Sequence, residues 1–142
     1  MTADARRIGP RLAFVAAVVL IEGLALTGYG IFVIVELARL GITGPAAVSN
    51  PASVTLEIII FLAMGIGLLV SAWGLWQGRR WARAPSVLAQ ILALVVGVPL
   101  IGAVGGVERT VGIVLSALAV VTVVVLLTPG MTRDLSGENE EA

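Results

Sequence analysis

The chain has 142 residues, of which 58% are hydrophobic and 13% are charged, and its formal net charge at pH 7 is zero. A soluble domain of this length could not bury so much apolar surface, because small domains have a high ratio of surface to volume, so lipid is the expected solvent. The charge balance gives no support to nucleic-acid binding. Because Cys and His are absent, disulfides, thiolate or imidazole metal sites and Ser–His triads are excluded, and we expect neither a metal nor a cofactor.

The first apolar run follows a short polar lead that carries three arginines, and it predicts a helix over residues 12–37. The run is too long for the apolar part of a signal peptide, and no small-residue cleavage site follows it. We therefore expect a retained transmembrane helix that is interrupted only by Glu22.

Three further apolar runs predict helices over residues 52–77, 85–103 and 110–128. Each is close to the ~20 residues that a helix needs to cross the hydrocarbon core of a bilayer. Asn50 followed by Pro51 is typical of a helix start, because Asn caps a helix and proline suits its first position.

The four runs predict an all-α, transmembrane four-helix bundle in a single domain of residues 1–142, with a flexible acidic tail at 131–142. With four spans, both termini and the hinge at residues 78–85 share one side of the membrane, which carries seven of the nine arginines. Because short cytoplasmic segments are enriched in basic residues, we expect a multi-pass protein of the cell membrane with both termini cytoplasmic. An Arg-only basic set beside much Ala, Val, Gly and Leu is typical of a GC-rich bacterial genome.

Small residues recur on one face of each predicted helix at helical spacing. In lipid, helices associate where small residues let their backbones approach closely, so four such faces predict a compact bundle. The four faces contain Ala16, Gly23, Thr27 and Gly30; Ala63, Gly67, Ser71, Gly74 and Gly78; Ser86, Gln90, Ala93 and Gly97; and Gly112, Ser116, Ala119 and Val123.

Glu22 is the strongest candidate for chemistry, because it lies about 16 Å beyond Arg11 along a helix, near the middle of the membrane. An ionised carboxylate there costs at least ~2.5 kcal/mol, so it should face the bundle interior, find a partner or take up a proton. Gln90 on the third helix and Tyr29, two turns along the same face, complete a candidate intramembrane polar site. Glu22 could join helices through a hydrogen bond or carry protons, and both interpretations remain open.

The hinge holds four candidate contacts for anionic lipid headgroups, namely Arg79, Arg80, Trp81 and Arg83. An Arg near an anionic membrane surface contributes about 1 kcal/mol, and the same charges also determine topology. At the outer helix ends we expect a solvated rim of weak ion pairs, such as Glu57 with Arg109.

Glu22, the segment at residues 78–90 and the hydropathy pattern resemble small four-span integral membrane proteins of actinobacteria. This resemblance implies a membrane location and a four-helix architecture, and no particular activity. Glu22 is also similar to the membrane-embedded Glu on the first helix of the small multidrug resistance family. The chain differs from that family in its greater length, its wide first loop and its few aromatic residues, Tyr29 being the only Tyr.

The sequence has no Gly-rich phosphate loop, catalytic carboxylate pair or activated Ser nucleophile, so we do not expect an enzyme. The leading hypothesis is a structural or accessory protein of the lipid bilayer that packs through its small-residue faces, as a homo-oligomer or with another membrane protein. The alternative is a small proton-coupled transporter that uses Glu22. A water-accessible polar cavity around Glu22 would favour transport, and a dry contact with Gln90 would favour the structural role.

Overall fold

A computed structural model describes residues 9–42 and 50–130 of the chain. These residues contain no strand, and they form α1 (Pro10–Leu40), α2 (Pro51–Trp76), the short 3-10 helix η1 (Arg80–Ala82), α3 (Arg83–Ile101) and α4 (Gly106–Leu127). Four helices in this described part of the chain are long and apolar enough to cross a membrane, which confirms the predicted all-α, four-helix class. The acidic tail predicted at 131–142 lies outside the described residues.

Local sequence determines where the first two helices begin and end. Pro10 and Pro51 occupy the first turns of α1 and α2, where the N–H that proline lacks would have no partner within the helix. Asn50 caps α2, because its side chain accepts a hydrogen bond of 2.9 Å from the backbone N–H of Ser53. α1 ends before Gly41, whose φ of 67° lies in the left-handed region that favours glycine.

The last two helices begin earlier than the sequence predicts. α3 begins at Arg83, two residues before Pro85, because proline is tolerated in the first turn of a helix. α4 begins at Gly106, so Glu108 and Arg109 lie in its first turn. A negative charge such as that of Glu108 is favoured at the positive end of the helix dipole.

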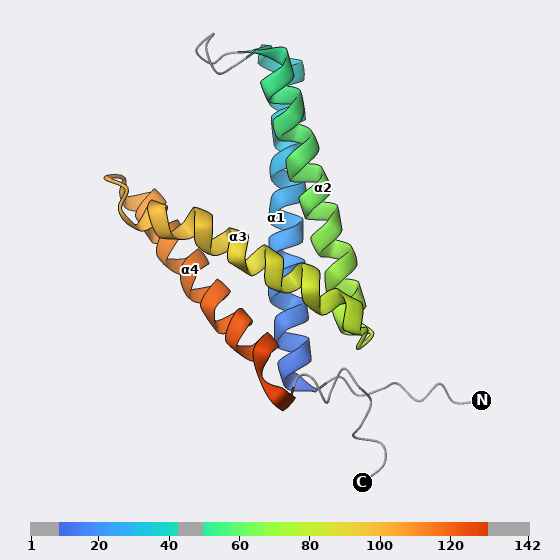
Figure 1. Ribbon diagram of the computed structural model, residues 1–142. Helices are drawn as coiled ribbons and strands as arrows, with labels where there is room; N and C mark the ends of the chain where they lie inside the picture. Colours follow the sequence, from blue (N-terminus) through green and yellow to red (C-terminus); the bar gives the residue numbers. More distant parts are fainter. Residues whose placement is uncertain (1–8, 43–49, 131–142) are drawn as a thin grey trace, which may run out of the picture.

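The helices form two hairpins, one of α1 and α2 and the other of α3 and α4 (Figure 1). Most contacts between helices lie within a hairpin, and the hairpins meet at the end where α1 begins and α4 ends. Away from that end they diverge, and the α3–α4 turn lies well apart from the outer ends of α1 and α2. The compactness that the small-residue faces predict is therefore found only where the hairpins meet.

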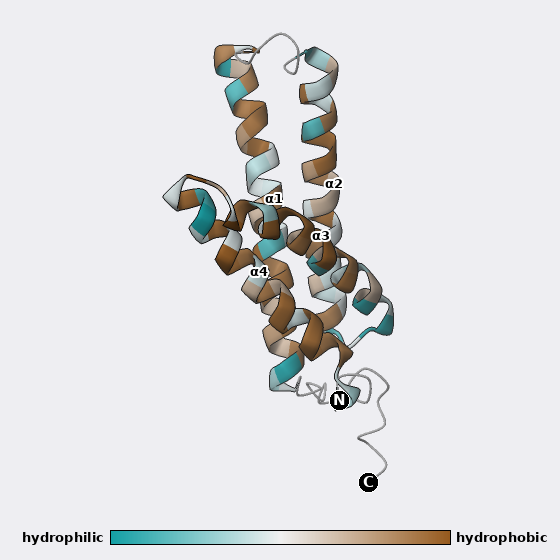
Figure 2. Ribbon diagram, turned by 60° about the vertical axis from the view of Figure 1, so that its left-hand side comes forward, coloured by the Kyte–Doolittle hydropathy of each residue, from teal (hydrophilic) through white to brown (hydrophobic). Residues whose placement is uncertain are grey.

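An apolar cluster joins the two hairpins at their shared end. It is made of Leu12, Val15, Ala16 and Val19 of α1, Leu68, Ala72 and Leu75 of α2, Ala82 of η1 and Leu126 of α4. Apolar residues occupy most of the length of each helix (Figure 2). Ile21, Val95 and Val124 each expose more than 60% of their surface, which water would not favour and lipid would.

Within each hairpin the helices touch at a pair of glycines. A Cβ on Gly23 would lie 3.1 Å from the Gly65 carbonyl oxygen, and a Cβ on Gly65 would lie 3.1 Å from that of Gly23. In the second hairpin a Cβ on Gly112 would lie 2.8 Å from the Gly97 carbonyl oxygen. Close backbone approach at small residues thus holds both hairpins.

The small-residue face predicted for α2 is wrong in its outer half. Gly67 belongs to that face, yet a Cβ there would meet nothing within 4 Å, and Ala63 is exposed. The glycine that packs on α1 is Gly65, because the buried face of α2 continues from it through Leu68 and Ala72. Ser71 and Gly74 of the predicted face are buried, as expected.

Candidate functional site

Glu22 of α1 meets Gln90 of α3 between the two hairpins. The Nε2 atom of Gln90 donates a hydrogen bond of 2.6 Å to the Oε2 atom of Glu22. Gln90 is fully buried, and Glu22 is partly buried. The contact expected between these two side chains is therefore present, and it connects one hairpin to the other.

The local sequence of α3 turns Gln90 inward. Gln90 lies one turn beyond Ser86 and two turns before Gly97, and all three are buried on one face of the helix. The Ser86 hydroxyl donates to the Ala82 carbonyl at 2.7 Å, so its polar group is satisfied within its own helix. The longer Gln90 side chain instead finds its partner on another helix, as amides in membrane helices commonly do.

The Glu22–Gln90 pair is incompletely satisfied. The Oε1 atoms of both side chains are buried and have no hydrogen-bond partner among the described residues. The hydroxyls of Thr122 and Ser116 on α4 are also buried and have no hydrogen-bond partner among the described residues. A carboxylate oxygen can bind a proton, and carboxylate and amide oxygens both accept hydrogen bonds, so this site can bind a proton.

Among residues 9–42 and 50–130, no group of three or more Asp or Glu side chains is placed to hold a metal ion. Within the described site, the Glu22 carboxylate can bind a proton and accepts the hydrogen bond of Gln90.

The prediction that Tyr29 belongs to this site is wrong. The Tyr29 hydroxyl donates a hydrogen bond of 3.1 Å to Glu57 of α2, and its ring packs against Phe61 with ring centroids 4.6 Å apart. A Cβ on Gly30 would lie 2.9 Å from Leu62, so α2 runs close beside α1 at this level. Tyr29 shares a helix face with Glu22 but does not contact it, because the Tyr29 hydroxyl bonds Glu57 on the adjacent helix α2.

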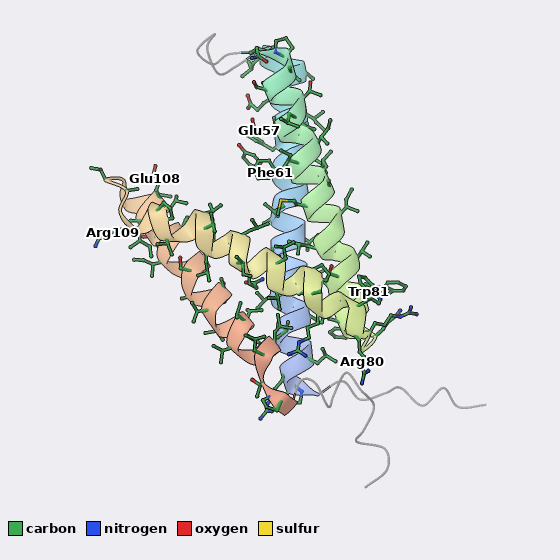
Figure 3. All side chains as sticks on the ribbon, in the orientation of Figure 1. Glu57, Phe61, Arg80, Trp81, Glu108 and Arg109 are labelled. Atoms are coloured by element: carbon green, nitrogen blue, oxygen red, sulfur yellow. The ribbon has the colours of Figure 1, made fainter. Side chains whose placement is uncertain are left out.

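The expected pair of Glu57 with Arg109 is also wrong. Glu57 lies on α2, whereas Arg109 lies at the far end of the second hairpin (Figure 3). The two hairpins diverge in this half of the molecule, which separates these side chains. Glu57 accepts the hydrogen bond of Tyr29 instead.

The hinge separates the four predicted headgroup contacts. The Nε atom of Arg79 donates a hydrogen bond of 2.8 Å to the Gln77 side chain. Trp81 packs against α2, where a Cβ on Gly74 would lie 2.7 Å from its ring. Arg80 and Arg83 instead line one groove on the surface of α3.

Two residues that the sequence interpretation did not single out take part in the packing. Gly65 provides the close contact of α2 with α1. Thr122 is fully buried on α4, where Val123 was predicted. The three-residue steps from Ser116 to Ala119 to Thr122 could have indicated it, because residues three apart share a helix face.

Comparison of the chain with known protein families, curated proteins and solved structures gave no match. The resemblances drawn from Glu22 and the hinge therefore stay predictions, and the functional inference depends on the geometry of the chain itself.

Proposed function

We propose that the protein is a non-enzymatic membrane protein of structural or accessory type, in which Glu22 holds two helical hairpins together. The observation that supports this role is the 2.6 Å hydrogen bond from the buried Gln90 amide to the Glu22 carboxylate. A carboxylate at this depth costs at least ~2.5 kcal/mol, which a partner on another helix helps to offset. A contact of this kind gives Glu22 a purpose that requires no substrate.

We place the protein in a bacterial cell membrane with both termini in the cytoplasm. This orientation rests on the positive-inside rule, since one side carries seven of nine arginines. The arrangement of the helices is compatible with it, because α1 begins and α4 ends near the same end of the molecule (Figure 1). Arg80 of the hinge lies toward that end as well (Figure 3).

The exposed small residues of α2 support assembly with a second copy or with another membrane protein. A Cβ on Gly67 would meet nothing within 4 Å, so this position is open to a neighbouring helix. Replacing Gly67 by Ile should therefore weaken an oligomer and leave the hairpin intact. Sedimentation of the detergent-solubilised variant tests this, and an unchanged oligomer distribution would argue against assembly through α2.

The Oε1 atoms of Glu22 and Gln90, which have no hydrogen-bond partner in the part of the chain that the structure describes, favour a second candidate, a small proton-coupled transporter. A buried carboxyl with a free acceptor beside it has a place for one proton. In such a transporter, the hydrogen bond to Gln90 holds the ionised form, and the proton is taken up and released as the hairpins move.

Glu22→Gln separates the two functions, because glutamine can still accept the Gln90 amide hydrogen bond but cannot carry a proton. A structural role predicts that Glu22→Gln keeps its stability within about 1 kcal/mol, whereas Gln90→Leu, which leaves the carboxylate unpaired, loses about 1–3 kcal/mol. A transport role predicts loss of proton flux into proteoliposomes carrying Glu22→Gln. Glu57→Gln serves as the control, because Glu57 bonds Tyr29 at a different level.

Each of the two measurements can eliminate one of the two functions. Undiminished proton flux through Glu22→Gln would eliminate the transporter, provided that the wild-type chain conducts protons. Wild-type stability of Gln90→Leu in detergent would instead remove the structural role of the pair.

A further inference from the structure

One groove of about 450 Å³ runs along the surface of α3 and combines positive charge with an apolar wall. Its charged end is made by Arg80 and Arg83, and its wall is made by Val87, Leu88 and Ile91 of α3 with Leu127 of α4. Leu88, Ile91 and Leu127 each leave about half or more of their surface exposed (58%, 49% and 59%). The groove is therefore open on its outward side, where the lipid or detergent around the helices can enter it.

The lining residues form one continuous stripe. Arg80, Arg83, Val87 and Ile91 recur at steps of three or four residues, which places them on one face of the helical segment. Eleven helical steps span about 16 Å, close to the ~15 Å of hydrocarbon in one leaflet of a bilayer. The groove thus has the length of one leaflet, with its charge at one end only.

This division of chemistry matches an anionic phospholipid. Guanidinium groups bind phosphate oxygens through paired hydrogen bonds, and basic pockets on the cytoplasmic side of membrane helices bind anionic headgroups. Among the described residues that line the groove, none is acidic. A soluble phosphate compound would use the charged end alone and would leave the aliphatic wall without a partner.

We propose that this groove binds one anionic phospholipid, with its phosphate between Arg80 and Arg83 and an acyl chain along Val87, Leu88 and Ile91. The lipid comes from the cytoplasmic leaflet. This assignment depends on the membrane orientation proposed above. Arg79 and Trp81 take no direct part, because Arg79 bonds Gln77 and Trp81 packs at Gly74. The lipid would lie on the exposed surface of the hinge, where η1 leads into α3.

Native mass spectrometry of the full chain in detergent, titrated with phosphatidylglycerol, tests this site. Two arginines at about 1 kcal/mol each predict about 30-fold weaker affinity in the double variant Arg80→Gln/Arg83→Gln. Arg79→Gln is the matched control: Arg79 bonds Gln77 and does not line the groove, so the affinity of this variant should stay within about twofold of wild type. Circular dichroism of each variant checks that the helices are retained.

Three results would overturn the proposal. The first is wild-type affinity in the double variant, and the second is equal binding of phosphatidylcholine and phosphatidylglycerol. The third is complete displacement of the lipid by millimolar inorganic phosphate, which would identify an anion site without an acyl chain. Because lipid binding in detergent does not depend on which side of the membrane the hinge faces, failure of the orientation would leave this measurement unaffected.

Discussion

The contact of α1 with α2 at Gly65 predicts that one added methyl group loosens the first hairpin. A Cβ at this position would lie 2.6 Å from the backbone nitrogen of Thr27, about 0.8 Å inside the 3.4 Å at which ordinary contact begins. It would also meet the Thr27 hydroxyl and the Gly23 carbonyl oxygen. Most of these atoms belong to backbone, so the helices themselves must separate to admit the methyl group.

Gly67 provides a matched control two residues away on the same helix. A Cβ there would meet nothing within 4 Å. Gly→Ala raises helix propensity by about 1 kcal/mol, and this gain is common to both positions and cancels between them. Overpacking costs about 1–3 kcal/mol, so Gly65→Ala should be less stable than Gly67→Ala by that amount.

Reversible unfolding of both variants as monomers, at a large excess of mixed micelles over protein, titrated with a denaturing detergent and followed by circular dichroism, measures this difference. We expect the midpoint of Gly65→Ala to fall below that of wild type and that of Gly67→Ala to equal or exceed it. Equal midpoints for the two variants would refute the close approach of α1 to α2 at Gly65.

Three further variants, one of them with its own control, test other contacts by the same titration. Gly112→Ala should be less stable than Gly106→Ala by about 1–3 kcal/mol, because a Cβ on Gly112 would lie 2.8 Å from the Gly97 carbonyl oxygen, whereas a Cβ on Gly106 would meet nothing within 4 Å. Asn50→Ala should lower the free energy of unfolding by about 1 kcal/mol, because it removes the cap of α2. An unchanged free energy of unfolding would show that the cap does not stabilise the protein. Tyr29→Phe removes an exposed hydrogen bond and should change stability by less than about 0.5 kcal/mol; a larger loss would mean that this contact matters more than its exposure indicates.

The number and approximate positions of the helices could be predicted because bilayer thickness sets a minimum length for each apolar run, whereas the helix ends differ by up to four residues. The contact of Glu22 with Gln90 could also be anticipated, since a polar side chain at that depth needs a partner. The sequence could not predict which glycine of α2 faces α1. A helix that is apolar on all sides gives no periodic signal for its packed face. Gly65 and Gly67 are equivalent in the sequence and differ only in the structure.

The placement of Tyr29 and the divergence of the hairpins were beyond the sequence for a related reason. Whether Tyr29 meets Glu22 or Glu57 depends on how α1 and α2 are aligned along their axes, which the close contacts at Gly23 and Gly30 decide. The angle between the hairpins depends on the geometry of η1 and of the apolar cluster beneath it. Neither is encoded in the hydropathy of a single helix.

The most direct test of a four-span chain with an internal hinge is the accessibility of single cysteines, because the protein has no native Cys that could react. Gln77→Cys reports the hinge and Val104→Cys reports the α3–α4 turn, and both positions are exposed and leave every charge in place. A membrane-impermeant maleimide should label Val104→Cys in intact cells and should label Gln77→Cys only after the membrane is opened. Labelling of both positions from outside, or of Gln77→Cys alone, would contradict the proposed arrangement.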